Sequence, residues 1–294
     1  MIYETGNSQL GNQFIVADAH VHIHDCFNME QLLCGALENF QHVTHRLLPF
    51  RQGGSQVDAA NGNRAAFLFL TEIAGYNWFG KLSAIATSGD RAQEFSLQHW
   101  TLHPTEESVS VIARHTSHQL LYAIAGRQLV TQEGLEVLAL ITDSTFDDGM
   151  TLEETVYQIS QAGAIPVLPW GFGKWLGGRG KVLKRFLERE DVPLFFLGDN
   201  SGRPVFWRRS PYFEMAEQKG LRVLPGTDPL PLASECSRPG SFGFIAEGRI
   251  DARTPAASIK QLLLDPRASV RAYGSLEMPF RFLRNQVAIR YGSR

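Results

Sequence analysis

Short apolar runs alternate with amphipathic segments along almost the whole chain of 294 residues. The runs have the length of strands, and the segments between them carry apolar residues at helical spacing. Strands are expected at Phe14–Val21, Ala65–Leu70, Gln119–Ala125, Val137–Ile141, Ile165–Leu168, Leu194–Leu197 and Arg222–Leu224. Strands and helices that alternate at this rhythm predict parallel pairing with right-handed crossovers, and therefore an α/β fold.

The amphipathic segments predict helices at Met29–Leu48, Leu152–Ala162, Lys181–Glu190, Tyr212–Lys219, Pro255–Leu264 and Phe280–Ile289. Two helix starts carry local signals: Thr151 stands three residues before Glu154, as in a capping box, and Pro255 suits a first helical position. We expect a TIM-like (βα) barrel that could be seven-stranded and distorted, with an open doubly wound sheet as the alternative. The segment Arg91–Ser117 shows no clear period and predicts no particular element.

Hydrophobic residues make up 44% of the chain, which is enough for one large core, so we expect a single domain over residues 1–294. The three cysteines, Cys26, Cys34 and Cys236, lack the paired spacing of a zinc knuckle and predict reduced thiols in a cytoplasmic protein. Residues Met1–Asn12 are polar, so we expect no export leader, and no apolar run approaches the ~20 residues that span a bilayer. We therefore expect no membrane partner.

The charge balance bears on the choice of partner. The formal net charge is −2 at pH 7 and the isoelectric point is about 6.5. Such a balance provides no bulk field to attract nucleic acid. The expectation is a small-molecule substrate and no nucleic acid as the main partner, with the oligomeric state left open.

The first predicted strand ends in Asp18-Ala19-His20-Val21-His22. Because residues i and i+2 of a strand point to the same side, the imidazoles of His20 and His22 should face one way, with Asp18 and His24 in the same register. Two imidazoles at this spacing can share one divalent ion. In parallel barrels the C-terminal strand ends hold the active site, and this motif lies at such an end. Polar residues at a barrel rim are the plainer interpretation.

At this motif the chain resembles the amidohydrolase superfamily and, more closely, the polymerase-and-histidinol-phosphatase (PHP) family. Gly126–Gly134 followed by Glu136–Leu140 is similar to that family's paired central strands. Leu152–Leu168 is similar to its helix and strand before an Ala-His-Pro element, and Gly226-Thr227-Asp228 to its late Gly-Ser-Asp element. The resemblance covers roughly residues 14–230 and implies a metal-dependent hydrolase.

Several positions depart from the family pattern. Where the family has Thr-Asp-His after its second strand, this chain has Thr71-Glu72-Ile73, and its central glutamate and next histidine are matched by Gln128 and Glu136. Leu168-Pro169-Trp170 replaces Ala-His-Pro, and Leu230 replaces a late histidine. A complete three-metal site is therefore not expected.

The resemblance implies a smaller site in which His20, His22 and Asp228 bind one divalent ion, either Zn, Mn or Fe. Asp228 is also a candidate catalytic base, and Glu72 is the second catalytic candidate, with Glu133 and Glu136 as possible supplements. The alternative for Asp228 is a turn residue in Pro-Gly-Thr-Asp-Pro.

A glycine-rich loop, Gly171–Lys181, follows the strand predicted at Ile165–Leu168. Glycines let backbone N–H groups approach an anion, and a helix start favours negative charge, so Lys174, Arg179 and Lys181 are candidate substrate-binding residues. The alternative is a surface lid. Two further substrate-binding candidates follow the next strand, Asn200 and Arg203, for which an Asx turn is the alternative.

Together these features predict a metal-dependent hydrolase that acts on a small anionic substrate. The PHP resemblance favours a phosphoester, and the wider amidohydrolase resemblance favours an amide or a lactone. The rival hypothesis comes from the departures: a barrel that has lost its catalytic metals and binds a small molecule or a protein.

Overall fold

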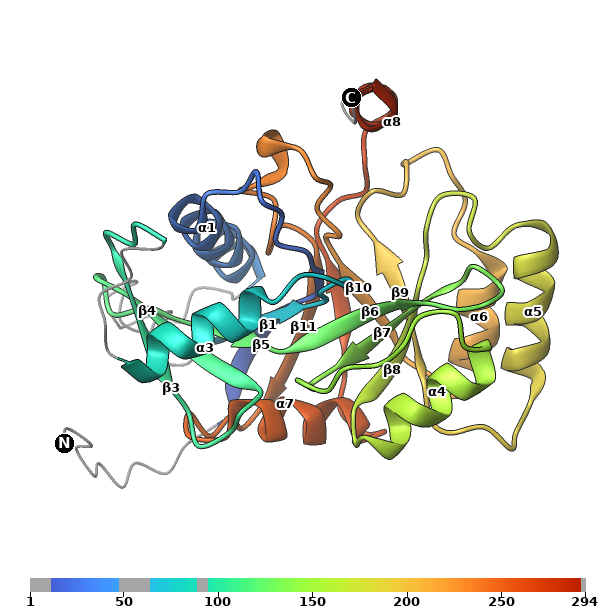
Figure 1. Ribbon diagram of the computed structural model, residues 1–294, viewed down its shortest axis with the longest axis horizontal. Helices are drawn as coiled ribbons and strands as arrows, with labels where there is room; N and C mark the ends of the chain where they lie inside the picture. The colour runs from blue at the N-terminus through green and yellow to red at the C-terminus, as the bar shows by residue number, and fades with distance from the viewer. Residues whose placement is uncertain (1–11, 48–63, 89–94, 292–294) are drawn as a thin grey trace.

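The computed structural model describes residues 12–47, 64–88 and 95–291, and their strands form two sheets (Figure 1). The first sheet has the order β12 (Arg271–Tyr273), β11 (Gly243–Gly248), β1 (Gln13–Val21), β2 (Arg64–Leu70), β5 (Leu120–Ile124), β4 (Ser110–His115) and β3 (Trp100–Pro104). The second has the order β10 (Val223–Gly226), β9 (Phe196–Asn200), β8 (Ile165–Pro169), β7 (Glu136–Leu140) and β6 (Gly126–Val130).

The α/β class is confirmed, but the pairing is mixed, and the expectation of parallel pairing throughout was wrong. Six of the ten pairings between these strands are antiparallel. The reason is visible between β6 and β7, where a short turn at Thr131–Leu135, with Gly134 at φ +74°, joins the strands. A connection this short makes a hairpin, because parallel neighbours need a crossover of a dozen or more residues.

The two sheets meet at two points near the ends of β1 and β2. Only Ala125 separates β5 from β6, so the chain passes directly from the first sheet into the second. Near this crossing a single bridge joins Glu72 to Arg127, and at the other point the Asp228 N–H donates to the His20 carbonyl at 2.8 Å. The described strands thus make two adjoining sheets, and the hydrogen bonding shows no closed barrel.

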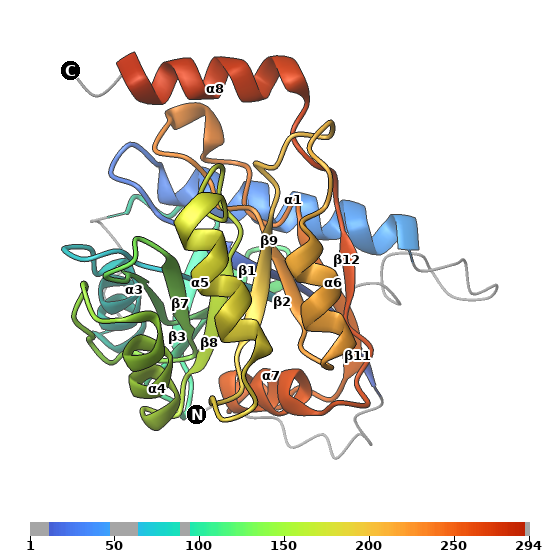
Figure 2. The same cartoon turned by 90° about the vertical axis from the view of Figure 1, so that its right-hand side faces the viewer.

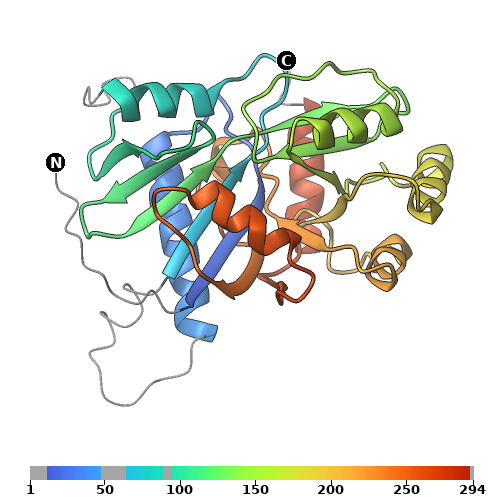
Figure 3. The same ribbon diagram turned by 90° about the horizontal axis from the view of Figure 1, so that it is seen from below.

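Seven α-helices surround the sheets within the described residues: α1 (Met29–Leu47), α3 (Trp78–Ser88), α4 (Leu152–Gln161), α5 (Gly177–Glu188), α6 (Pro211–Gln218), α7 (Pro255–Leu264) and α8 (Pro279–Tyr291). Figures 1 and 2 show α7 and α8 at opposite ends of the sheets. Seen from below in Figure 3, α7 crosses the near ends of the strands. The carboxyl ends of β1 and β10 therefore lie toward α8.

Three apolar clusters hold these layers together. One lies between the first sheet and the helices α1 and α3, a second between the two sheets and α7, and a third between the second sheet and the helices α4, α5 and α6. Successive side chains of β1 point to opposite faces of the sheet, and this alternation supplies the first two clusters. Val16 belongs to the first cluster, and Ile15 and Ala17 belong to the second. Both faces of β1 are buried, and its carboxyl end is fixed from two sides.

Most predicted elements are found within a few residues of the expected bounds, and Leu48 of the first predicted helix lies outside the described residues. The capping box is present, since the Thr151 side chain accepts from the Glu154 N–H and Glu154 accepts from the Thr151 N–H. The segment left without an assignment forms the β3–β4 hairpin, apart from residues 91–94, which lie outside the described part. The helix expected at Lys181 begins earlier, at Gly177, so half of the predicted glycine-rich loop is helical.

Cys26, Cys34 and Cys236 form no disulfide. None of the helices within residues 12–47, 64–88 and 95–291 combines the length and apolarity needed to cross a lipid bilayer.

Candidate metal site

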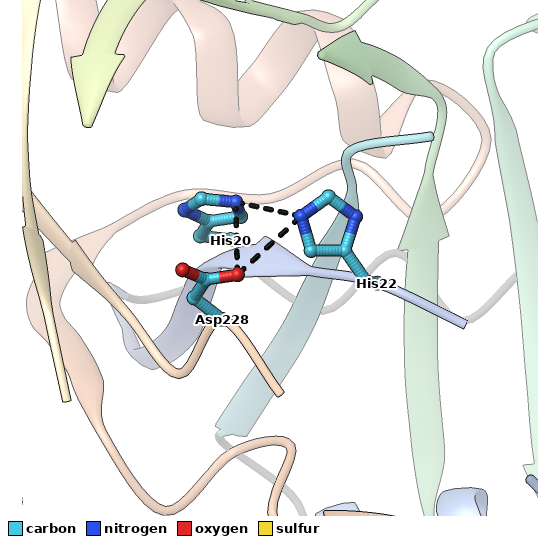
Figure 4. A group of neighbouring side chains, drawn as sticks. All are labelled: His20, His22 and Asp228. Carbon is cyan, nitrogen blue, oxygen red and sulfur yellow. Dashed lines mark hydrogen bonds and ion pairs between the residues drawn. The ribbon is translucent and has the colours of Figure 1, made fainter. Parts of the chain in front are cut away.

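Three predicted metal ligands come together where the two sheets meet (Figure 4). His20 and His22 lie at the carboxyl end of β1, and Asp228 lies two residues after β10. One ligand atom from each side chain lies within 4.8 Å of the other two. The hydrogen bond from the Asp228 N–H to the His20 carbonyl ties the two segments together directly beside these atoms.

The spacing of these atoms fits a single ion. His20 Nε2 lies 3.0 Å from His22 Nε2 and 3.5 Å from Asp228 Oδ1, and His22 Nε2 lies 3.4 Å from the same oxygen. Donors about 2.0–2.1 Å from an ion in a tetrahedral arrangement stand roughly 3.3–3.4 Å apart. Two imidazole nitrogens and one carboxylate oxygen also suit Zn, Mn or Fe. The three side chains therefore fit a divalent ion in both chemistry and spacing.

The environment keeps both imidazoles neutral, as metal binding requires. Burial lowers the pKa of His20, and the nearby Lys174 ammonium lowers it further, against the opposing effect of Asp228. Burial and the neighbouring His20 lower the pKa of His22 to about 3. Each ring therefore has a nitrogen lone pair available at neutral pH.

Asp228 is held in an unusual conformation. Its φ is +46°, in the left-handed region, where non-glycine residues are uncommon but aspartate is tolerated. The Asn200 side-chain amide donates to Asp228 Oδ2 and itself accepts from the Gly202 N–H, so Oδ1 is turned toward the histidines. Burial would raise the pKa of Asp228, but His20, His22, Lys174 and the Asn200 hydrogen bond together lower it. Asp228 is thus an oriented carboxylate, and Asn200 is the residue that positions it.

Gly226 allows β10 to approach β1 closely enough for this site to form. A Cβ at this position would collide with the backbone nitrogen and Cβ of His20. We expect Gly226→Ala to push His20 away from Asp228, to lower the free energy of unfolding by about 1–3 kcal/mol and to weaken metal retention. Thermal unfolding and elemental analysis measure the two effects.

Gly178 provides the matched control, because a Cβ there meets no atom within 4 Å. Gly178→Ala should leave both measurements close to those of the wild type. Equal metal content in Gly226→Ala and Gly178→Ala would show that the close approach is unimportant.

Asp18 was expected to face the same way as the histidines, but hydrogen bonds occupy its carboxylate. It accepts from the His20 N–H at 3.2 Å, the Thr227 N–H at 2.9 Å, the Thr227 hydroxyl at 2.5 Å and the Gly240 N–H at 2.8 Å. Burial raises the pKa of Asp18 to about 6, and these hydrogen bonds oppose that rise. Asp18 therefore clamps the segment that carries Asp228 against β1. His24 lies outside the donor cluster, with its Nε2 2.9 Å from the Pro229 carbonyl.

Replacing Asp18 by alanine should destabilise the protein strongly. The change leaves the Thr227 hydroxyl and three backbone N–H groups without their acceptor, and each buried unsatisfied donor costs about 1–3 kcal/mol. We expect a loss of about 3 kcal/mol or more in the free energy of unfolding, measured by urea denaturation. The exposed Asp143 serves as the control, and Asp143→Ala should change stability by less than about 0.5 kcal/mol. Equal stability of the two variants would contradict the clamp.

Gln128 is a residue that the predicted site did not include. Its Oε1 lies 3.1 Å from His20 Nε2, so an amide oxygen stands beside the three predicted donors. Gln128 is on β6, which enters the second sheet directly after the crossing from β5. The only signal in the sequence was its match to the central glutamate of the PHP pattern. Its neutral oxygen could complete the donor set.

Glu72 is close to this region but is engaged elsewhere. Its Oε2 forms a salt bridge with Arg127 at 2.7 Å, and its Oε1 accepts from the Phe79 N–H at 2.7 Å. Burial raises the pKa of Glu72, and these two contacts oppose the rise. Glu72 thus joins the end of β2 to β6 and to the first turn of α3, and its catalytic role stays a prediction.

A cavity of about 390 Å³ opens beside the donor cluster. Asp228, Gln128, Asn200, Lys174 and Glu136 line its inner part, and the Lys174 ammonium pairs with Glu136. Burial lowers the pKa of Lys174, and Asp228 opposes that change. Two of the predicted substrate-binding residues, Lys174 and Asn200, therefore lie at the cavity.

The other three predicted substrate-binding residues do not line this cavity. Arg179 donates to the carbonyls of Gly134 and Gly173, which fixes the loop before α5. Arg203 forms a bidentate salt bridge with Asp199, and Lys181 is exposed on α5. The role of these three residues in binding a substrate stays a prediction. Arg179 and Arg203 instead hold parts of the protein together through the contacts just described.

Helix α8 forms the outer wall of the cavity, through residues that sequence reasoning did not single out. A buried charged cluster anchors it to η1 (Ala233–Glu235) and the segment that follows. Arg238 Nη1 lies 3.0 Å from Glu235 and 2.6 Å from Glu277, and Arg281 Nη2 lies 2.8 Å from Glu235. These alternating charges compensate one another, and α8 is held over the cavity through the half-exposed Arg281, whose partner Glu235 is fully buried.

Comparison with known proteins gives similarity of fold alone. No protein-family profile and no curated protein sequence matches the chain. PsfC from Pseudomonas syringae PB-5123 is 14% identical, with a TM-score of 0.51 over 97% of this chain and 100% of PsfC. The lesion-specific endonuclease PfuEndoQ from Pyrococcus furiosus is 9% identical, with a TM-score of 0.52 over 89% of this chain, which spans 59% of the endonuclease. These similarities are compatible with the PHP-type fold expected from the histidine motif.

The endonuclease corrects one expectation drawn from composition. Nucleic acid was excluded as the main partner because the net charge is −2. A protein with this fold is a lesion-specific endonuclease, so the exclusion was wrong. The physical reason is that net charge describes the whole surface, whereas phosphate contacts depend on a few cations at the binding site.

Proposed function

We propose that this chain is a metal-dependent hydrolase of phosphoesters. The observation that carries the proposal is the cluster of His20, His22 and Asp228, whose donor atoms have the spacing of a single-ion site beside a cavity that Asp228 lines. The PHP resemblance supports the phosphoester as the bond that is broken. The fold similarities are compatible with this assignment.

In this proposal His20, His22 and Asp228 hold the ion, and Asn200 keeps the Asp228 carboxylate turned toward the imidazoles. A bound divalent ion would supply Lewis-acid activation of water and of the phosphoryl group. Asp228 is also the proposed proton acceptor, because it is oriented at the cavity and its lowered pKa keeps the carboxylate ionised and able to accept a proton.

Lys174 is the proposed contact for the anionic part of the substrate. Its ammonium reaches the cavity and is paired with the Glu136 carboxylate. On binding, a phosphoryl oxygen of the substrate would replace that carboxylate as the partner of the ammonium. A cation at this place offsets the charge of the bound phosphate near Asp228. The cavity volume of about 390 Å³ lies within the usual 300–1,000 Å³ of small-ligand sites.

The test combines metal analysis with hydrolysis. The protein as purified should contain about one Zn, Mn or Fe ion per chain, because the described residues form one donor cluster rather than three sites. It should hydrolyse p-nitrophenyl phosphate or bis(p-nitrophenyl) phosphate, and a chelator should remove both the ion and the activity. The two compounds separate monoester from diester chemistry.

The rival is a binding protein without catalysis, favoured by the loss of family histidines at Ile73, Glu136, Pro169 and Leu230. Absence of bound metal, even after reconstitution with Zn or Mn, would refute the hydrolase proposal. Bound metal without hydrolysis of either compound would favour the rival.

A further inference from the structure

One face of α8 lines the cavity with side chains of two kinds. Phe282, Asn285, Gln286 and Ile289 follow the spacing i, i+3, i+4 and i+7, which puts them on a single stripe of the helix. Leu283 lies off this stripe and is 62% exposed. The inner stripe therefore offers rings, aliphatic surface and amide groups to whatever occupies the cavity.

The two ends of the cavity differ in chemistry. The end at the donor cluster is charged, with Lys174, Glu136 and Asp228. Toward α8 the lining combines the rings of Phe172 and Phe282 with the charged side chains of Glu235, Arg238 and Glu277, which pair with one another. Because those charges are already paired, the rings of Phe172 and Phe282 are the surface that suits a flat apolar part of a ligand whose anionic group binds at the other end.

The aromatic end has room for a partner. The rings of Phe172 and Phe282 meet edge to face, with their centroids 5.1 Å apart, and Phe172 is 46% exposed. Half of the Phe172 side chain therefore remains uncovered beside the cavity. A flat ring stacked in this position would cover it, which is how sequence-tolerant nucleotide sites hold a base.

The side-chain amides of Asn285 and Gln286 indicate which kind of flat group the ligand carries. Asn285 is 3% exposed, and its side-chain amide makes only long hydrogen bonds. The amide donates to Glu235 Oε1 at 3.4 Å and accepts from the Arg284 guanidinium at 3.4 Å. No hydrogen bond links the half-buried Gln286 amide to another residue in the described part of the chain. An amide carries both a donor and an acceptor, and so does the edge of a nucleobase, which Asn and Gln pair with in two-point contacts. A purely hydrocarbon group would leave these amides unmatched.

We propose that the cavity binds a nucleotide, either free or as one unit of a nucleic-acid strand. The phosphate lies at Lys174 and the donor cluster, and the base lies against Phe172, Phe282 and the amides of α8. The orientation of the phosphate rests on the proposed function, whereas recognition of the base rests on Phe172 and α8.

The experiment measures binding to the protein as purified by isothermal titration calorimetry. The probes are nucleoside 5′-methylenephosphonates of adenine, guanine, cytosine and thymine, whose P–C bond resists hydrolysis, with methylphosphonate as the fragment that lacks a base. We expect at least one nucleotide analogue to bind about tenfold more tightly than methylphosphonate, since a stacked base contributes about 1–3 kcal/mol. A single-stranded nonamer of the preferred base tests the source, because tighter binding than the analogue indicates a strand and weaker binding a free nucleotide.

Variants of α8 locate the base. Phe282→Ala and Gln286→Leu should reduce the affinity for the analogue toward that for methylphosphonate and leave methylphosphonate binding unchanged. Leu283→Ala on the outer face is the matched control and should change neither. Because Phe282 is buried, Gln286→Leu keeps the test valid if Phe282→Ala fails to fold.

The outcomes separate this inference from the proposed function. Metal and hydrolysis without any preference for the base-containing analogue overturn the nucleotide site alone. Base-dependent binding without metal or hydrolysis overturns the hydrolase alone. Unchanged affinity in both α8 variants shows that the base does not lie against this helix.

Discussion

His22→Ala is expected to abolish metal retention while leaving the protein folded. The variant loses one of the two imidazoles that stand 3.0 Å apart at the end of β1. Loss of a residue that only orients a ligand already costs about 10–100-fold in metal affinity, so loss of the ligand itself should cost on the order of 100-fold or more. Elemental analysis after dialysis and titration with Co²⁺ followed by visible absorption measure the change.

The fold should survive because His22 contributes little to the apolar clusters, and none of the three clusters contains it. We expect a change of roughly 1 kcal/mol in unfolding free energy without metal. His42→Ala, at an exposed position of α1, is the control and should retain metal like the wild type. A metal-free wild type together with an unfolded His22→Ala would show that His22 is structural.

Asp228→Asn should lower kcat/KM for phosphoester hydrolysis on the order of 1,000-fold. The substitution removes the negative charge that faces both imidazoles at 3.4–3.5 Å and keeps the shape of the side chain. Removal of one preorganised electrostatic group at an active site typically costs 10²–10³-fold, and here the same group also holds the ion. Asparagine also tolerates the left-handed φ of +46°, so the turn should persist.

Steady-state kinetics with p-nitrophenyl phosphate or bis(p-nitrophenyl) phosphate, alongside metal content, measures this effect. Asp191→Asn is the control, because Asp191 is a surface residue paired with Arg189. Its kinetics should match those of the wild type. An Asp228→Asn protein with full activity would remove Asp228 from the proposed machinery and leave the histidines without their carboxylate partner.

The elements of the fold could largely be predicted from local patterns, and the arrangement of the sheets could not. β1 and β2 have continuous apolar runs, and α7 begins at its predicted Pro255. The mixed pairing depends on connections such as the turn at Thr131–Leu135, whose shortness was visible in the sequence but was not used. The alternating apolar pattern suggested one closed sheet. Instead, the chain crosses from one sheet to the other between β5 and β6, so the strands form two separate sheets.

The donor cluster could be predicted in part, for a physical reason. His20 and His22 were found from the two-residue period of a strand, and Asp228 from a family resemblance. Asp18 lies in the same register of the strand, but its carboxylate accepts hydrogen bonds from Thr227 and Gly240. Such distant partners are known only from the folded structure. The inner face of α8 was missed for the same reason, because an amphipathic pattern does not show which cavity a helix will cover.

The clamp between Asp18 and Thr227 joins residues 209 positions apart. This separation sets when, during synthesis of the chain, the metal site can form. At about 5–20 residues per second, a ribosome makes Thr227 roughly 10–40 s after Asp18. Throughout that interval the nascent chain has its histidine pair but neither the carboxylate that completes the cluster nor the helix over the cavity. A growing chain is therefore unable to assemble the complete site, and cellular metal and substrate meet it only after translation has passed α8.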